Sequence, residues 1–143
     1  MKIIIINGPN LNNLGNRDTD QYGSFSLEDI NKKIKEQFPS IEFIFFQSNV
    51  EGELINCIQN ASGKFDALII NPGGYAHTSV ALRDALQDSN IIKVEVHLSN
   101  LAAREEYRHI LLTASVCNGY IAGFKELSYM SAVFLITKLL EKK

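Results

Sequence analysis

The sequence predicts an α/β fold built on a parallel β-sheet, and three observations support this fold class. Short apolar runs alternate with amphipathic segments along the chain. The apolar runs are nearly continuous rather than alternating, which is typical of strands covered on both faces. The length of 143 residues suits one domain with its own core. We therefore expect residues 1–143 to form a single domain, without internal repeats or linkers.

Five apolar runs are expected to form the strands of the sheet. They are short and rich in β-branched or aromatic residues, as buried strands are. The expected strands are residues 2–6, 41–46, 65–70, 91–96 and 116–122.

Four amphipathic segments are expected to form helices. The first begins with a capping box at Ser26, and the second ends near Gly63. The last ends with Lys138, Lys142 and Lys143, where the helix dipole favours cations. The positions that mark the four helices are Leu27, Ile30, Ile34 and Phe38; Leu54, Ile58 and Ala61; Val80, Leu82, Ala85 and Leu86; and residues 129–140.

The alternation of strands and helices indicates a flavodoxin-like, doubly wound five-stranded parallel sheet with strand order 2-1-3-4-5. In that order, the carboxyl ends of the first, third and fourth strands are neighbours, and ligands bind there. Polar residues follow these three strands at positions 7–10, 71–79 and 97–100. Taken alone, residues 7–10 are better explained as a turn. Residues 72–74 are equally consistent with a tight turn, and His97 with a hydrogen-bonded strand end. Together they predict one donor-rich crevice for a small anionic, hydroxylated ligand.

The composition excludes several classes of function. A net charge of −2 argues against a generic basic nucleic-acid binder. The opening apolar run is too short for a signal peptide or a membrane helix, so we expect no membrane partner and a cytoplasmic location. Cys57 and Cys117 form no cysteine–histidine cluster, and we expect them to be reduced and buried.

The loop between the first strand and its helix, residues 7–24, is longer than such loops usually are, and we interpret it as a lid. Gly15 and Gly23 are candidate hinges, and Arg17 and Tyr22 are its reactive side chains. A tyrosine has a reference pKa of about 10, so it is a weak base unless a guanidinium favours its phenolate form. Arg108 is a second candidate for that cation. A solvated loop is the alternative interpretation.

The sequence lacks the residues that several kinds of chemistry require. His77, His97 and His109 do not have metal-ligand spacing. Dinucleotide, P-loop and nucleophile-elbow motifs are absent, and no lysine has an obviously buried apolar setting. General acid–base catalysis by histidine and tyrosine, without metal or cofactor, is what remains.

Three blocks of the sequence resemble the type II 3-dehydroquinate dehydratases, and the resemblance spans nearly the whole chain. The first block has NGPNL at 7–11, LGNR at 14–17 and YG at 22–23. The second is NPGGYAHTSVALRDA at 71–85, and the third has EVHLSN at 95–100 and REEYR at 104–108.

The resemblance implies a metal-free anti elimination of water from 3-dehydroquinate through an enolate, giving 3-dehydroshikimate in the shikimate pathway. It also implies a homododecamer built as a tetramer of trimers, with no cofactor. The catalytic residues it implies are Tyr22 as general base, Arg17 as the lid arginine that makes Tyr22 a phenolate, Asn10 as the residue that orients a water, and His97 as general acid.

The resemblance also implies how the substrate is bound. The backbone N–H groups of Leu98 and Ser99 form a carboxylate cradle. Ring-hydroxyl and orientation contacts come from Asn71, His77 and Arg108, and Asp84 reaches the site of a neighbouring subunit.

Three segments depart from the usual family pattern. The lid has Asp-Thr-Asp at 18–20, where the family more often has Glu-Pro after its arginine. Residues 109–113 are more apolar than usual, and residues 124–128 lack a glycine-rich turn. A flavodoxin-like binding module for a nucleotide or small anion, and a catalytically silent assembly protein, are the alternatives to the dehydratase.

Overall fold

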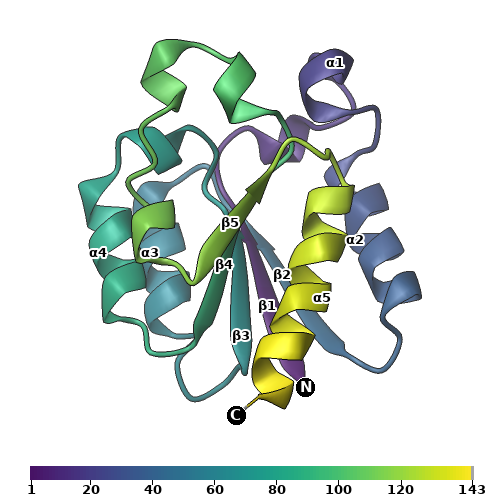
Figure 1. Cartoon of the computed structure of the whole chain (residues 1–143), viewed down its shortest axis with the longest axis vertical. Coiled ribbons are helices and arrows are strands. Elements are labelled where there is room, and N and C mark those ends of the chain that lie inside the picture. Colours follow the sequence, from purple (N-terminus) through teal and green to yellow (C-terminus); the bar gives the residue numbers. More distant parts are fainter. Residues whose placement is uncertain (143) are drawn as a thin grey trace.

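A computed structural model describes residues 1–142 and has a five-stranded parallel sheet at its centre (Figure 1). The strand order is β2-β1-β3-β4-β5, so the predicted fold class is confirmed. All four strand pairs are parallel. The strands are β1 (Lys2–Asn7), β2 (Glu42–Gln47), β3 (Ala67–Asn71), β4 (Ile92–His97) and β5 (Gly119–Ala122).

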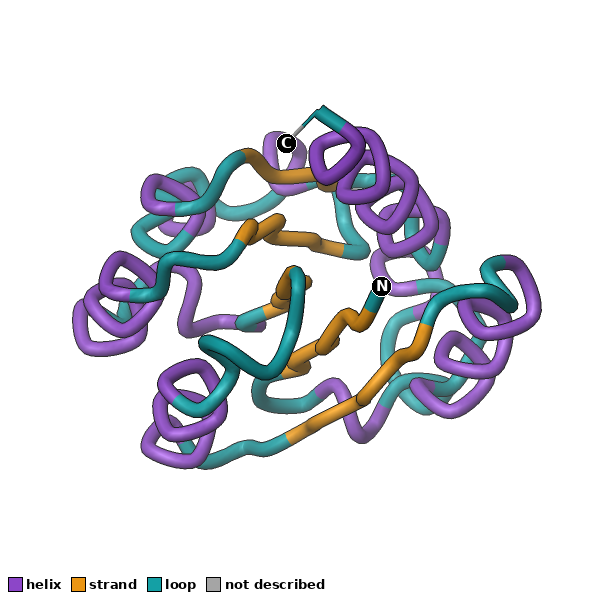
Figure 2. The backbone as a smooth tube through the Cα atoms, turned by 90° about the horizontal axis from the view of Figure 1, so that it is seen from below, coloured by secondary structure: helices purple, strands orange, loops and turns teal. Residues whose placement is uncertain are grey.

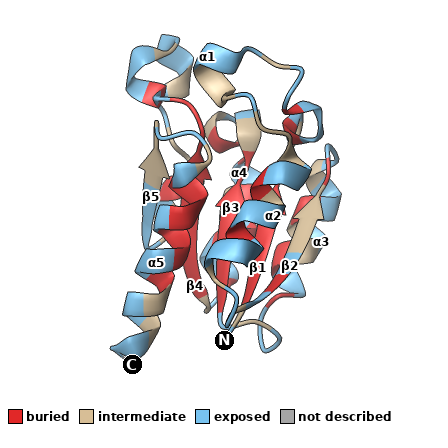
Figure 3. Cartoon of the chain, turned by 90° about the vertical axis from the view of Figure 1, so that its right-hand side faces the viewer, coloured by how far each residue is buried: buried red, intermediate tan, exposed pale blue. Residues whose placement is uncertain are grey.

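Helices cover both faces of the sheet and divide the core in two (Figure 2). Alternate residues of the central strands pack against helices α2 and α5 on one face and against α3 and α4 on the other. Buried residues lie along the sheet and on the inner sides of these helices (Figure 3). The helices are α1 (Thr19–Tyr22), α2 (Leu27–Gln37), α3 (Glu51–Gln59), α4 (Val80–Asp88) and α5 (Leu127–Glu141).

The polar residues expected just after three strands are in fact their last residues. Asn7, Asn71 and His97 end β1, β3 and β4, and all three are buried. Asn7 and Asn71 are paired in register, so their side chains leave the sheet on the same face. His97 leaves on the other face, because it alternates with Val96 of the α2–α5 core.

Most boundaries differ from the predictions by one or two residues, and two differences have a clear structural cause. Residues 116–118 are not strand, because Ala114–Val116 forms a 3₁₀ turn and Asn118 then exchanges two 2.8 Å hydrogen bonds with the backbone of Lys93. Helix α3 ends at Gln59, before Ala61, which lies in the following turn. The predicted capping box at Ser26 is confirmed, with Asp29 as its partner. Of the lysines expected to end the last helix, Lys143 lies outside the described residues.

Two expectations about single residue types were wrong. Lys93 is buried, and its ammonium donates to the backbone carbonyls of Ser89 (2.5 Å) and Ile91 (3.4 Å), which compensate its charge. Cys57 and Cys117 are only partly buried free thiols. Burial nevertheless raises the pKa of Cys57 to about 11 and that of Cys117 to about 12. Within residues 1–142, no helix combines the length and apolar character needed to cross a membrane.

Candidate active site

A cleft opens at the carboxyl ends of β1, β3 and β4, where the sequence predicted it. Its empty volume, including its open mouth, is about 530 Å³. Nine of the ten predicted site residues line the cleft, and Asp84 lies outside it on α4. The lining residues are Pro9, Asn10, Leu11, Arg17, Tyr22, Asn71, Gly73, Gly74, His77, His97, Leu98, Ser99, Leu101, Arg104 and Arg108.

We call residues 7–10, 71–77 and 95–99 the floor of the cleft. Two of its loops interlock through glycines. A Cβ on Gly8 would lie 2.5 Å from the carbonyl oxygen of Pro72, and the Gly8 N–H donates to the Asn71 carbonyl at 2.8 Å. Gly73 has a φ of +60° and lies against the Pro9 carbonyl. A side chain at Gly8 would force the backbone to move, and one at Gly73 would crowd the Pro9 carbonyl at a φ that most residues disfavour, so the two glycines let the loops pack closely.

Asn10 enters the floor with a left-handed backbone, at a φ of 70°. Asparagine tolerates this conformation better than most residues. The Asn10 N–H donates to Oδ1 of Asn49 at 2.9 Å, and Gln47 Nε2 donates to the same oxygen and to the Gly8 carbonyl. Asn49 lies in the loop after β2 and does not line the cleft, so nothing in its position along the chain marked it as a support of the site.

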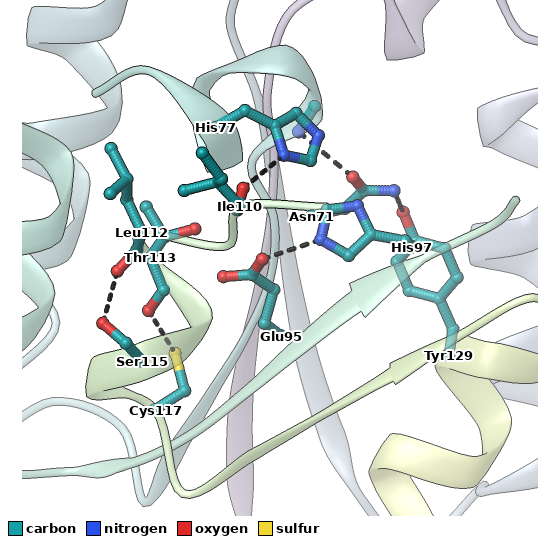
Figure 4. A network of polar contacts seen from close by, with 11 residues as sticks. Asn71, His77, Glu95, His97, Ile110, Leu112, Thr113, Ser115, Cys117 and Tyr129 are labelled. Carbon is teal, nitrogen blue, oxygen red and sulfur yellow. Dashed lines mark hydrogen bonds and ion pairs between the residues drawn. The ribbon is translucent and has the colours of Figure 1, made fainter. Parts of the chain in front are cut away.

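His97 is held from behind by Glu95, two residues earlier on the same face of β4 (Figure 4). The ring Nε2 lies 2.7 Å from Oε1 of Glu95, whose side chain is fully buried. A carboxylate accepts, so Nε2 carries a hydrogen and Nδ1 remains for other partners. Glu95 was not among the predicted site residues, although an acidic residue two positions before a strand-end histidine was the available signal.

His77 stacks on His97 with the ring centroids 6.2 Å apart. Its Nδ1 donates to the carbonyl oxygen of Ile110 at 2.7 Å (Figure 4). Burial lowers the pKa of His77, and the hydrogen bond to Ile110 opposes this only in part. The ring is therefore neutral at pH 7, and Nε2 is left as an acceptor.

We call the outer part of the 7–24 loop, residues 15–23, the lid, and it contains a single helical turn that the sequence did not predict. In α1 the Asp18 side chain accepts from the Asp20 N–H at 3.0 Å and caps the turn. A four-residue helix has no apolar periodicity, so its sequence resembles that of a loop. Leu14 is buried in the core just before the lid begins.

Two guanidinium groups lie against the ring of Tyr22. The Cζ atom of Arg17 is 3.8 Å from the ring centroid, and that of Arg104 is 5.3 Å away. Arg108, which the sequence suggested as a second candidate, also lines the cleft and pairs with Glu105 at 2.8 Å. The same carboxylate oxygen lies 3.5 Å from Arg104, which follows the 3₁₀ turn of residues 101–103.

Arg104 also links the floor to the segment that follows the 3₁₀ turn of residues 101–103. Its Nη1 donates to the Ser99 hydroxyl at 3.0 Å, and its side chain is only 9% exposed. A nearly buried cation beside the backbone of Leu98 and Ser99 makes this corner of the cleft suited to a carboxylate. Within residues 1–142, no three His, Cys, Asp or Glu side chains are grouped to hold a metal ion.

Comparison with known proteins identifies the family of this chain. The model of the family described as "Dehydroquinase class II" matches residues 1–137. A 3-dehydroquinate dehydratase of Fusobacterium nucleatum is 49% identical over 99% of this chain and 100% of the relative. The crystal structure of a type II dehydroquinase from Butyrivibrio crossotus superposes with a TM-score of 0.93 and 47% identity, over 96% of this chain and 97% of that one. This chain belongs to the class II dehydroquinases.

More distant family members keep the fold. The type II dehydroquinase structure from Propionibacterium acnes is 32% identical, with a TM-score of 0.89 over 95% of this chain and 96% of that one.

The three departures from the usual family pattern have local structural consequences. The lid turn is closed by Asp18 in the segment where the family more often has a proline. The apolar segment 109–113 is tied to the floor, because the Leu112 N–H donates to the Ala76 carbonyl at 2.8 Å. Where the glycine-rich turn is missing, Lys125 adopts a φ of 52°, a conformation that glycine favours.

Proposed function

We propose that the cleft dehydrates its substrate through an enolate, with a base supplied by the lid and an acid supplied by the floor. As a class II dehydroquinase, the chain catalyses the dehydration of 3-dehydroquinate, a hydro-lyase reaction of the shikimate pathway. The observation that carries the proposed mechanism is one cleft lined by both the Tyr22–arginine cluster and the His97–Glu95 pair.

Tyr22 is the proposed base. The substrate is a β-hydroxy ketone, so the first step removes a hydrogen from the carbon between the ketone and the carbinol. A phenolate accepts that proton. Arg17 and Arg104 place two guanidinium groups beside the ring, where they pair with its negative charge in a site that the lid covers. The same cations stabilise the negative charge that moves onto the enolate oxygen.

His97 is the proposed acid that protonates the departing hydroxyl. The Glu95 carboxylate accepts from Nε2 and orients the ring, so that Nδ1 is the nitrogen left to face the substrate. Asn10 orients a water against the enolate oxygen, and the left-handed backbone that Asn49 holds sets the direction of its side chain. Because these groups are fixed before the substrate arrives, little reorganisation is needed as charge develops.

The remaining residues of the floor bind and orient the substrate. We assign the carboxylate to the backbone N–H groups of Leu98 and Ser99, beside the Arg104 guanidinium. Asn71, His77 and Arg108 contact ring hydroxyls. His77 meets such a hydroxyl through its free Nε2, which only accepts in the neutral ring.

A direct assay tests the activity. Purified protein, stripped of metal with a chelator, is mixed with 3-dehydroquinate, and the near-ultraviolet absorbance of the conjugated enone product is followed. We expect a rise that the chelator does not reduce, and no rise would refute the activity and favour a binding module or a silent assembly protein. Borohydride added with substrate should trap no covalent adduct. An adduct on a lysine would contradict the enolate route.

We further propose that the chain assembles into a homododecamer of four trimers in the cytoplasm. In this assembly Asp84 of one subunit completes the cleft of its neighbour. Several large apolar side chains are more than half exposed, and contacts between subunits would cover surface of this kind. These side chains are Val50, Val80, Tyr107, Ile110, Tyr120, Phe124, Leu127 and Phe134.

The mass in solution tests the assembly, and a monomer would contradict it. Asp84→Ala should raise KM, whereas Asp88→Ala on the same exposed side of α4 should not. Equal effects of the two changes on KM would show that Asp84 is not part of the site.

A further inference from the structure

The hydroxyl of Tyr129 is an unexpected group at its position. Tyr129 lies in the first turn of α5 and is fully buried in the core against the sheet. The neighbouring buried positions of the helix are mostly apolar, among them Met130, Val133 and Ile136. A phenylalanine would fill the same space, so packing does not account for the oxygen. A buried hydroxyl needs partners, and the identity of those partners gives the reason for it.

Both partners of Tyr129 are asparagines at the ends of strands. Tyr129 donates to Oδ1 of Asn7 at 2.5 Å and accepts from Nδ2 of Asn71 at 3.0 Å (Figure 4 shows the second contact). Asn7 and Asn71 are register partners on β1 and β3, so both amides point to the face that α5 covers. Burial raises the pKa of Tyr129, and the hydroxyl therefore keeps the proton that it donates.

The contacts with Tyr129 and Gly73 together fix the positions of the oxygen and the nitrogen of the Asn71 amide. Oδ1 of Asn71 accepts from the Gly73 N–H at 3.2 Å, while Nδ2 donates to the Tyr129 hydroxyl. If the amide were flipped, two N–H groups would face each other at Gly73. One Nδ2 hydrogen and one lone pair of Oδ1 remain for other partners. Asn71 lines the cleft, so these are the groups that a ligand meets.

We propose that Tyr129 is a positioning residue, which acts through Asn71 to hold its amide in the orientation that binds a substrate hydroxyl. The inference rests on the proposed binding role of Asn71. It gives α5, which contributes no residue to the lining of the cleft, a function in substrate recognition. Without the hydroxyl, only the Gly73 N–H holds the amide, and rotation about the last side-chain bond misdirects the group that meets the ligand.

Tyr129→Phe is the variant that removes the hydroxyl and keeps the ring. We expect KM for 3-dehydroquinate to rise about tenfold, as for the loss of one well-placed hydrogen bond, with kcat within about twofold of its original value. The melting temperature also falls, because buried amide groups lose their partner. Ile136→Val, at a fully buried position of the same helix, is the control. It should lower the melting temperature with KM unchanged.

The Asn71→Ala background shows whether Tyr129 acts through Asn71. If it does, Tyr129→Phe adds no further rise in KM to that of Asn71→Ala. A full additional rise, or an unchanged KM in Tyr129→Phe alone, would reduce Tyr129 to a structural residue. An unchanged KM in Asn71→Ala alone would instead refute the proposed binding role of Asn71. Turnover by the unmodified protein, measured in the same assay, tests the activity separately.

The unmodified protein offers a second test that does not depend on the folding of a variant. In its NMR spectrum, one hydrogen of the Asn71 side-chain amide should exchange with solvent much more slowly than the other, because Tyr129 buries it. Rapid exchange of both hydrogens would overturn the proposal even where Tyr129→Phe fails to fold.

Discussion

The floor and the lid of the cleft are built by opposite means. The floor consists of strand ends and interlocked loops, and Asn71, His97 and Ser99 in it are all at most 5% exposed. Its groups are held by partners on other elements, since Tyr129 accepts from the Asn71 side chain and Asn49 accepts from the Asn10 backbone N–H. The lid is one exposed helical turn, closed mainly by contacts among residues 18–23.

This difference matches the division of chemistry that we propose. Groups that bind the substrate and stabilise charge work best when they are fixed in advance. A group that takes a hydrogen from the substrate must first let the substrate in, so a lid suits the base. Mutations in the floor should therefore affect folding and binding together, whereas mutations in the lid should affect turnover with little loss of global stability.

The largest expected effect belongs to the base on the lid. Tyr22→Phe should lower kcat at least about a thousandfold, as for the loss of a general base, while substrate still binds. Tyr107→Phe is the matched control, since Tyr107 also lies near an arginine but is 63% exposed and outside the cleft. Steady-state kinetics and a binding titration measure the two quantities. Substantial turnover by Tyr22→Phe would rule Tyr22 out as the base.

Two glycines contrast the regions directly. Gly8→Ala places a Cβ 2.5 Å from the Pro72 carbonyl, and we expect the free energy of unfolding to fall by about 3 kcal/mol as the floor separates. Gly15→Ala meets nothing closer than 3.7 Å, so only its φ of +94° costs about 1 kcal/mol. Denaturant unfolding of both variants measures the difference. Equal losses would mean that the floor is no more rigid than the lid.

The cap of the lid helix should have a smaller, local effect. Asp18→Ala removes the acceptor of the Asp20 N–H, which is worth about 1 kcal/mol to the turn. We expect kcat/KM to fall a few-fold with the melting temperature unchanged. Asp20→Ala keeps the capping bond and serves as the control. A fall in melting temperature without a change in kcat/KM would contradict the assignment of this turn to the lid.

The smallest expected effect is a change in the pH dependence of stability, and it comes from His77 in the floor. The pKa of His77 is lowered by burial in the folded protein, while the unfolded chain has a value of about 6.5. Above pH 6.5 the His77 ring is mainly neutral in both the folded and the unfolded state. As the pH falls from 6.5 to the folded pKa, the unfolded state binds the proton first and stability is lost.

The His77→Gln variant isolates this contribution. Between pH 7.5 and pH 5, denaturant unfolding should show a smaller fall in the free energy of unfolding for His77→Gln than for the unmodified protein. His109→Gln, at an exposed position, is the matched control and should follow the unmodified protein. A steeper loss in His77→Gln would show that the ring gains protons on folding, which is the opposite of what its burial predicts.

The sequence was sufficient for the parts of the molecule that follow a regular period or a fixed register. Continuous apolar runs predicted the strands, and the alternation of strands with helices predicted their order. That order brought Asn10, Asn71 and His97 to one edge. The short turn of α1 has no period to detect. Asn49 and Arg104 support the site through contacts made only in three dimensions, which local pattern does not reveal. The burial of Lys93 was missed for the same reason.

The most direct test of the central claim separates the base on the lid from the acid on the floor. Each variant is incubated with 3-dehydroquinate in D₂O, and NMR follows exchange of the hydrogen next to the ketone against a sample without protein. We predict that His97→Asn loses dehydration but still exchanges this hydrogen, whereas Tyr22→Phe loses both. Undiminished exchange in Tyr22→Phe would contradict the division of base and acid between lid and floor.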